Sequence, residues 1–231
     1  MIDTVAFDAD DTLWHNEHLF QDTQKKLEGI VQRYRPGENI HEALFAVEMQ
    51  NLALFGYGIK GFTLSMVEAA IQLTGGRIAA EEIHEIVQLG KTMIEAPVDL
   101  LDGVEETLAA VTGRYRVILI TKGDIVDQSS KIERSGLAGH FEQVEIVPRK
   151  NAGVYRAIFE RHGIEPARAV MVGNSMPSDV LPMLELGGHA VHVPYELIWA
   201  HEAHDEDPVS ERFHRLQRLN ELPELLERLT R

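Results

Sequence analysis

The apolar residues of this chain follow two kinds of pattern. Five short runs rich in valine and isoleucine show little alternation, which is typical of strands buried on both faces. These runs are 4–8, 116–121, 144–147, 169–173 and 190–194. Helical patterns separate the later four, at roughly 123–136, 151–163 and 177–187. Strands that alternate with helices predict an α/β fold: an open parallel sheet with helices on both faces.

The interval between the first two predicted strands is too long for a single crossover. It contains no convincing strand but four helical patterns, at about 16–34, 40–54, 63–74 and 80–95. We therefore predict an α/β core formed by residues 1–14 and 98–231, with an all-helical cap, residues 15–97, inserted after the first strand. The tail is expected to be a polar loop from His201 and then a helix at 221–229.

The composition of the chain mainly excludes some classes of partner and site. The 231 residues are 44% hydrophobic and 26% charged, as in an ordinary globular protein with a large core. A formal net charge of −15 argues against nucleic acid as a partner, because polyanions demand basic patches. No apolar run approaches the ~18 residues of a membrane span, and the start MIDTVAFDAD lacks the layout of a signal peptide. The absence of cysteine excludes disulfides and thiolate sites and fits a cytoplasmic location.

Residues able to do chemistry gather at the carboxyl ends of the predicted strands. Asp8 and Asp10 follow the first strand, Thr121 ends the second, and Lys150 comes shortly after the third. The fourth strand leads into GNSMPSD, residues 173–179. Ligands of open α/β sheets bind beyond these strand ends, so we expect the side chains to share one edge. Such a set fits a divalent cation held by carboxylates, with a phosphate that bridges to Thr121 and Lys150.

These stretches resemble the four motifs of the haloacid dehalogenase-like hydrolase superfamily. DADDT (8–12), Thr121, Lys150 and GNSMPSD (173–179) match those motifs in order and with suitable spacing. The resemblance covers nearly the whole chain, since a helical cap inserted after the first motif is typical of one branch. It implies a Rossmann-like core and the activity of a magnesium-dependent phosphomonoesterase on a small phosphorylated metabolite.

The resemblance also implies a role for each matching residue. Asp8 would be the nucleophile that becomes an aspartyl-phosphate, and Asp10 the general acid and base. Thr121 and Lys150 would hold the remaining phosphoryl oxygens. The implied cofactor is Mg²⁺, with these expected ligands: Asp8, Asp10 through its main-chain carbonyl, Asp179, and Asn174 directly or through water.

One position departs from the commoner pattern of the superfamily. Many relatives carry aspartate after the glycine of the fourth motif, where this chain has Asn174. Asparagine in this region is typical of the dehalogenase branch, so a 2-haloacid dehalogenase that uses Asp8 is an alternative. Dehalogenases lack the acid at the position of Asp10, because halide leaves without a proton, and Asp10 therefore favours a phosphatase. A phosphomutase and a non-catalytic binding protein on the same fold are further alternatives.

Four more residues are predicted to contact the substrate, because they follow Thr121, enter the cap or lie in a glycine-rich cap loop: Lys122, Gly123, Trp14 and Lys60. Trp14 could equally be a packing anchor, and the loop of Lys60 could equally be a plain connection between two helices. We expect Asp11 to be solvated or to support the site without reacting. Lys131 lies in the middle of a predicted helix and is expected on its solvated face. The identity of the substrate stays open, as does the choice between monomer and homodimer.

Overall fold

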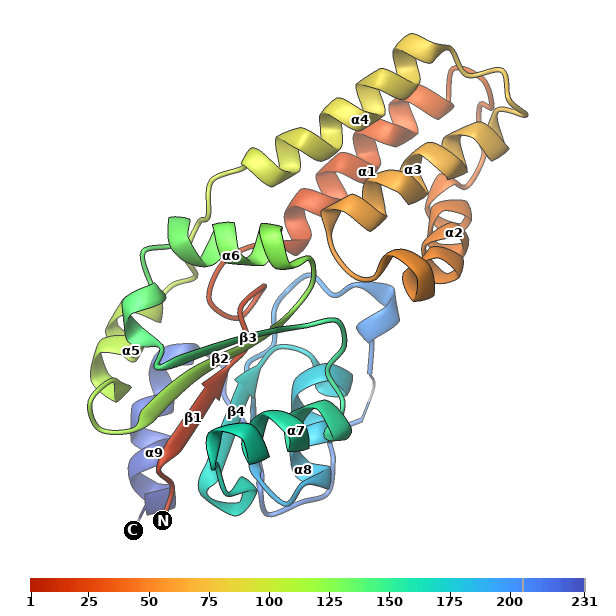
Figure 1. Ribbon diagram of the computed structural model, residues 1–231. Coiled ribbons are helices and arrows are strands. Elements are labelled where there is room, and N and C mark those ends of the chain that lie inside the picture. Colours follow the sequence, from red (N-terminus) through yellow and green to blue (C-terminus); the bar gives the residue numbers. More distant parts are fainter. Residues whose placement is uncertain (205, 231) are drawn as a thin grey trace. The chain divides into compact units, whose positions relative to one another are not determined.

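The computed structural model describes residues 1–204 and 206–230. Its centre is a six-stranded sheet in the order β3-β2-β1-β4-β5-β6, in which every neighbouring pair is parallel (Figure 1). The strands are β1 (Thr4–Phe7), β2 (Arg116–Lys122), β3 (Gln143–Val147), β4 (Ala169–Gly173), β5 (His189–His192) and β6 (Phe213–Arg215). The predicted α/β class and Rossmann-like sheet are confirmed. The edge strand β6 falls in the tail, where the sequence predicted only a loop before the last helix.

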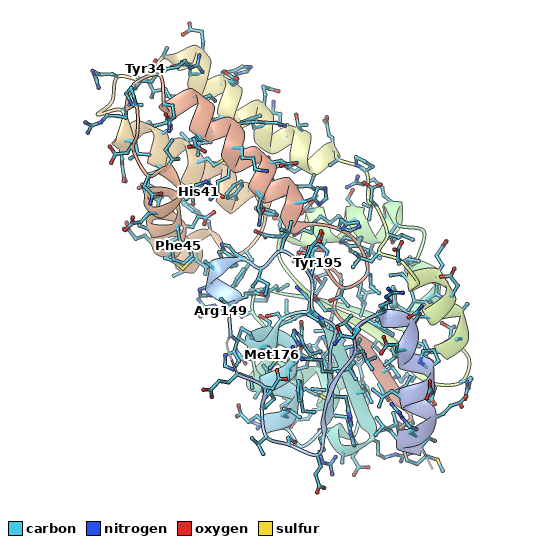
Figure 2. The ribbon with its side chains drawn as sticks, turned by 180° about the vertical axis from the view of Figure 1, so that it is seen from behind. Tyr34, His41, Phe45, Arg149, Met176 and Tyr195 are labelled. Atoms are coloured by element: carbon cyan, nitrogen blue, oxygen red, sulfur yellow. The ribbon has the colours of Figure 1, made fainter. Side chains whose placement is uncertain are left out.

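Helices cover both faces of the sheet because the strand side chains alternate between two apolar clusters. Val5 and Phe7 of β1 belong to the cluster that also contains Leu108, whereas Ala6 packs in the cluster of Tyr155. The helices of this part are α5 (Val104–Val111), α6 (Ile125–Arg134), α7 (Ala152–His162), α8 (Leu181–Glu185) and α9 (Leu222–Thr230). Figure 2 shows the same part from behind, with Met176 of the second cluster labelled. The uninterrupted apolar runs of the sequence thus reflect burial on both faces.

The chain divides into two compact units. The sheet unit contains Met1–Glu17, Val98–Lys122 and the chain from Gln128 onward; the helical unit contains His18–Pro97 together with Gly123–Asp127. The helices of the long insertion are α1 (Glu17–Val31), α2 (Ile40–Phe55), α3 (Ile59–Leu73) and α4 (Ala80–Glu95). They have an apolar core of their own, centred on residues such as Leu44, Met66 and Ile86. No helix in the described parts of the chain is long and apolar enough to cross a membrane.

Candidate active site

The loop after β1 is a tight turn that brings two aspartates out of the sheet. The ladder continues for one residue, because the N–H of Asp8 donates to Val172 O of β4 at 2.9 Å. The chain then reverses: Ala9 O accepts from the N–H groups of Thr12 (3.2 Å) and Leu13 (2.8 Å). Asp11 has a φ of 62°, a left-handed conformation that aspartate tolerates better than most residues. The turn therefore fixes where the Asp8 and Asp10 side chains begin.

Asp8, Lys150 and Asp179, which we call the Asp8 cluster, meet at the carboxyl ends of the strands. The Lys150 ammonium bonds Asp8 Oδ1 and also donates to Asp179 Oδ1 at 2.7 Å. All three residues are buried, Asp179 completely. Lys150 holds its place because the next residue, Asn151, caps α7 by accepting from Val154 N at 3.0 Å. Three residues predicted from separate motifs thus lie in direct contact.

The electrostatics of the Asp8 cluster show a shortage of positive charge. Burial raises the pKa of Asp8 to about 6; Lys150 opposes this, while the neighbouring charge of Asp179 adds to it. Burial alone would lower the pKa of Lys150, but the charges of Asp179 and Asp8 raise it instead. Two carboxylates share one ammonium here, so the cluster as a whole favours a further positive charge.

Asp179 is placed by a π turn and by a glycine. The turn, Met176–Val180, follows β4, and Asp179 Oδ2 accepts from Ser175 N at 3.0 Å. Tyr155 of α7 donates from its hydroxyl to Ser178 O at 3.1 Å and ties the turn to the sheet unit. A Cβ on Gly173 would lie 2.2 Å from Asp179 Oδ2, so only glycine allows this approach. Single π turns of this kind are often found at functional sites.

Asp10 lies in a different set of contacts, the Asp10 cluster of Asp10, Trp14, Gln128 and Lys131. Trp14 Nε1 donates to Asp10 Oδ1 at 2.6 Å, and Gln128 Nε2 donates to Asp10 Oδ2 at 2.7 Å. Lys131 Nζ lies 3.1 Å from Oδ1 and also donates to Asn16 Oδ1 at 2.8 Å. Every contact holds the carboxylate in one orientation beside the turn that carries Asp8.

The Asp10 cluster bears on what the sequence predicted for two of its members. Lys131 was expected on a solvated face, but this is wrong: the residue is 6% exposed and pairs with Asp10. Trp14 is 1% exposed and bonds Asp10, so it orients that carboxylate and packs in the core, as expected of a packing anchor, while its predicted contact with substrate stays a prediction. Gln128 was not predicted at all. It lies three residues before Lys131 on α6, on the same side of the helix, and that spacing was the available signal.

Oxygen atoms suited to a hard cation lie between Asp8 and Asn174. The amide of Asn174, with its nitrogen turned toward its neighbours, lies 3.2 Å from Asp8 Oδ2 and 3.3 Å from the main-chain oxygen of Asp10. In this orientation the amide nitrogen faces Asp8, and not the oxygen that would ligate a cation. Among the described residues, no group of three or more His, Cys, Asp or Glu side chains could hold a metal. A cation would therefore bind two carboxylates plus amide, main-chain or water oxygens, a donor set that Mg²⁺ commonly takes.

Thr121 and Lys122, at the end of β2, complete the polar edge. Thr121 is buried, and Lys122 Nζ donates to Ser178 Oγ at 2.9 Å. Lys122 also pairs with Glu202 of the 3₁₀ turn Ala200–Glu202. Burial, followed by the charge of Lys150, lowers the pKa of Lys122 to about 8. Glu202 was not predicted, because the polar stretch around it was interpreted as a solvated loop.

Two other predicted contact residues belong to the helical unit. Lys60, near the start of α3, pairs with Asp124 at 2.8 Å. Gly123 has a φ of 143°, which glycine adopts without strain. Within this unit, a Cβ on Gly58 would lie 3.3 Å from Asp124 N, so the glycine-rich loop and the segment after β2 pack closely. Their predicted contact with substrate stays a prediction.

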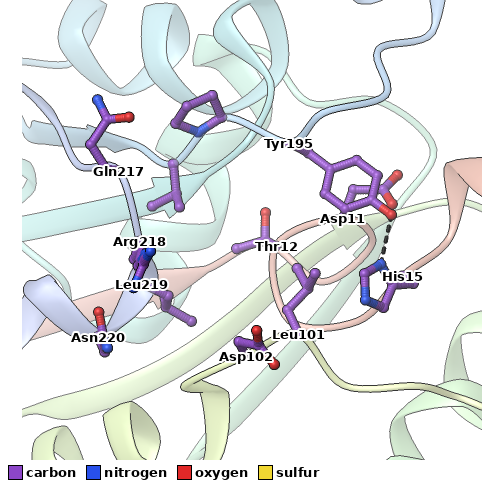
Figure 3. A pocket seen from close by; sticks show the side chains of 12 residues that line it. Asp11, Thr12, His15, Leu101, Asp102, Tyr195, Gln217, Arg218, Leu219 and Asn220 are labelled. Carbon is purple, nitrogen blue, oxygen red and sulfur yellow. Dashed lines mark hydrogen bonds between the residues drawn. The ribbon is translucent and has the colours of Figure 1, made fainter.

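Asp11 lines a cavity of about 400 Å³ (Figure 3). Its Oδ1 accepts from Asn16 N at 2.8 Å and from Glu17 N at 3.0 Å, where α1 begins. Asp11 is 8% exposed, so the solvated role is wrong, whereas a supporting role agrees with these bonds. His15 Nδ1 lies 2.7 Å from the hydroxyl of Tyr195 across the same cavity. Asp8, Asp10, Lys150 and Asp179 do not line it.

Comparison with known proteins agrees with this geometry. The family of haloacid dehalogenase-like hydrolases matches residues 2–187. The chain belongs to this family. A haloacid dehalogenase-like family hydrolase from Xanthomonas campestris has a similar solved structure, with 38% identity and a TM-score of 0.90, covering 99% of this chain and 91% of that one. The protein is thus shown to be of the hydrolase class.

Two further relatives of this haloacid dehalogenase-like hydrolase carry different names. Pyrimidine 5′-nucleotidase YjjG of Escherichia coli (strain K12) is 25% identical over 222 residues, 89% of each chain. The structure of a 2-haloacid dehalogenase from Pseudomonas syringae pv. Tomato DC3000 matches with 19% identity and a TM-score of 0.67, covering 99% of this chain and 100% of that one. At that identity the second match concerns the fold alone.

Proposed function

We propose that this hydrolase is a Mg²⁺-dependent phosphomonoesterase that acts on a small phosphorylated metabolite through an aspartyl-phosphate on Asp8. The observation that carries the proposal is the Asp10 cluster. Trp14, Gln128 and Lys131 hold the carboxylate of Asp10 in one orientation, two residues from the candidate nucleophile Asp8. A carboxylate fixed in this way supports a reaction that includes a proton transfer. Loss of an alkoxide requires a proton, whereas loss of a halide does not.

In the first step, Asp8 attacks phosphorus and the bond between phosphorus and the leaving oxygen breaks. Asp10, in its acid form, gives its proton to that oxygen, so the leaving group departs as a neutral alcohol. Lys150, through its contact with Asp8, would hold one phosphoryl oxygen, and Thr121, one residue before the end of the adjacent strand β2, would hold another. When bound beside Asp8 and Asp179, Mg²⁺ would draw negative charge from the phosphoryl oxygens.

In the second step, water attacks the phosphorus of the aspartyl-phosphate. Asp10, now ionised, accepts a proton from the water, the bond between phosphorus and Asp8 breaks, and inorganic phosphate leaves. The ammonium of Lys131, 3.1 Å from Asp10 Oδ1, helps to hold the carboxylate in position during both steps. Both carboxylates then return to their starting states. The relative named as a pyrimidine 5′-nucleotidase supports a phosphate ester as the substrate.

Phosphate release from p-nitrophenyl phosphate, measured with and without Mg²⁺, tests this function. The wild type should turn over only with the metal, and Asp8→Asn should lose at least about 10³-fold in kcat, because the amide is no nucleophile. Peptide mass spectrometry of acid-quenched enzyme should find one phosphoryl group on Asp8.

The matched control is Asp3→Asn, the same substitution ahead of the same strand, where the side chain pairs with Arg168 at the surface. Its activity should equal that of the wild type. Full activity of Asp8→Asn, or release of halide from 2-chloropropionate without metal and no release of phosphate, would contradict the proposal.

A further inference from the structure

Lys122, Ser178 and Glu202 form a closed polar group beside the two aspartate clusters. Lys122 donates to Ser178 Oγ at 2.9 Å, Ser178 Oγ lies 3.4 Å from Glu202 Oε1, and the Glu202 carboxylate pairs with the Lys122 ammonium. The side chains of Lys122 and Glu202 are only 18% and 14% exposed. Both charges are largely removed from water, so removing one partner would leave the other charge partly buried and uncompensated.

This group lies close to both aspartate clusters. Gln128 donates to Asp10 Oδ2 at 2.7 Å and to the main-chain oxygen of Lys122 at 3.2 Å, so it links the Asp10 carboxylate to the main chain of Lys122. Ser178 adjoins Asp179 in the π turn. The charges of Asp179, Asp8 and Asp10 all act on Lys122. Because the group adjoins Asp179 and is within electrostatic reach of Asp8 and Asp10, we expect the leaving group of a substrate bound at these aspartates to meet it.

The chemistry of the group suits hydroxyl groups better than a second anion. A hydroxyl both donates and accepts, so it can donate to the Glu202 carboxylate while it accepts from Ser178 or Lys122. A carboxylate or phosphate on the leaving group can only accept, and it meets the negative charge of Glu202 in a partly desolvated place. An anionic leaving group would also have to compete with Glu202 for the ammonium of Lys122.

We propose that Glu202 determines the substrate class: it selects phosphate monoesters whose leaving group is neutral and rich in hydroxyls, and rejects those with a second anionic group. The proposal rests on the phosphomonoesterase function given above. Glu202 acts both by accepting from substrate hydroxyls and by keeping Lys122 paired, so that no free ammonium attracts an anionic leaving group.

The test compares sn-glycerol 3-phosphate with 3-phosphoglycerate, which differ by a hydroxymethyl group against a carboxylate. The wild type should prefer the glycerol ester by about tenfold or more in kcat/KM. Glu202→Gln should lower this preference by about tenfold, chiefly through a lower KM for 3-phosphoglycerate. Glu202→Asp, which keeps the charge, should retain most of the preference. Glu211→Gln, the same substitution at an exposed position of the same tail, should leave it unchanged.

Each outcome decides between the proposals. If Glu202→Gln lowers kcat/KM equally for both esters, Glu202 is only structural and the selectivity proposal is wrong while the phosphatase function stands. The same holds if the wild type prefers 3-phosphoglycerate. If the wild type with Mg²⁺ hydrolyses neither these esters nor p-nitrophenyl phosphate, the phosphomonoesterase function fails and the selectivity proposal fails with it.

Discussion

Asp8 and Asp10 are two residues apart on one turn, yet their carboxylates lie in different surroundings. The Asp8 cluster is a buried chain of charges in which Lys150 alone bonds two carboxylates. The Asp10 carboxylate receives two neutral donors, Trp14 and Gln128, as well as one ammonium. The carboxylate of Asp8 thus has too little positive charge around it, whereas both oxygens of the Asp10 carboxylate have hydrogen-bond donors.

This difference explains how one loop can supply two chemical roles. A carboxylate that faces a cation and a phosphoryl group can react as a nucleophile, and burial keeps competing water away from it. A carboxylate held in one orientation beside the nucleophile can serve as the proton carrier, because proton transfer requires a fixed geometry. Environment, and not residue type, distinguishes the two aspartates.

The substitution Asp10→Asn should distinguish the role of the Asp10 cluster from that of the Asp8 cluster with the largest effect. With an alkyl phosphate we expect kcat to fall by about 10²–10⁴-fold, because neither proton transfer has its carrier. With p-nitrophenyl phosphate the leaving group needs no proton, so the first step should survive and the second should stall. Stopped-flow measurement should show a burst of nitrophenolate close to one equivalent, whereas Asp8→Asn should show none. Steady turnover of the alkyl ester within about threefold of wild type would remove Asp10 from the mechanism.

Lys131→Met should have a smaller effect, confined to the Asp10 cluster. Loss of its ammonium leaves Asp10 with Trp14 and Gln128 and leaves Asn16 without a donor, so the carboxylate becomes less well oriented. We expect kcat to fall about 10- to 100-fold with little change in KM. Steady-state kinetics of the variant and of Lys26→Met, an exposed lysine on α1, measure this. A rise in KM with unchanged kcat would show instead that Lys131 binds substrate.

Asp11→Asn should change only how stability depends on pH. Burial raises the pKa of Asp11 from 3.8 to about 7, although the N–H groups of Glu17 and Asn16 oppose this. Between pH 3.8 and about 7, the folded protein therefore keeps a proton on Asp11 that the unfolded chain has released. The contribution of this proton to the free energy of unfolding is fully present below pH 3.8 and is lost as the pH rises through 7. Asparagine accepts the same N–H groups and cannot ionise.

Urea unfolding at about pH 5 and pH 8 measures this effect. The wild type should lose more free energy of unfolding between the two values than Asp11→Asn does, by a difference on the order of 1 kcal/mol. Equal losses in the two proteins would show that Asp11 is ionised at both pH values.

Much of the sheet could be predicted because strands buried on both faces appear in the sequence as uninterrupted runs of apolar residues. The prediction missed α5, although Val104, Leu108 and Val111 recur at helical spacing after Gly103. It also missed β6, a three-residue edge strand within a polar tail. Such a strand is defined by its partner β5 and has too few residues to show a pattern of its own.

The Asp8 cluster was accessible from sequence because each member follows a recognisable strand. Half of the Asp10 cluster was not, since Gln128 and Lys131 lie on a helix where polar residues usually face solvent. Only the tertiary structure brings that face against Asp10. Glu202 was missed for a similar reason: its partner Lys122 is eighty positions earlier, and no local pattern connects a loop carboxylate to it.

The close approach of Gly173 to Asp179 makes the two positions depend on each other although they are six residues apart. Any side chain at position 173 would occupy the space of the Asp179 carboxylate, so a substitution there would displace Asp179 as well. A redesign of this chain that keeps the Asp179 carboxylate in its present place must therefore treat Gly173 as fixed, even though glycine has no side chain to react or bind.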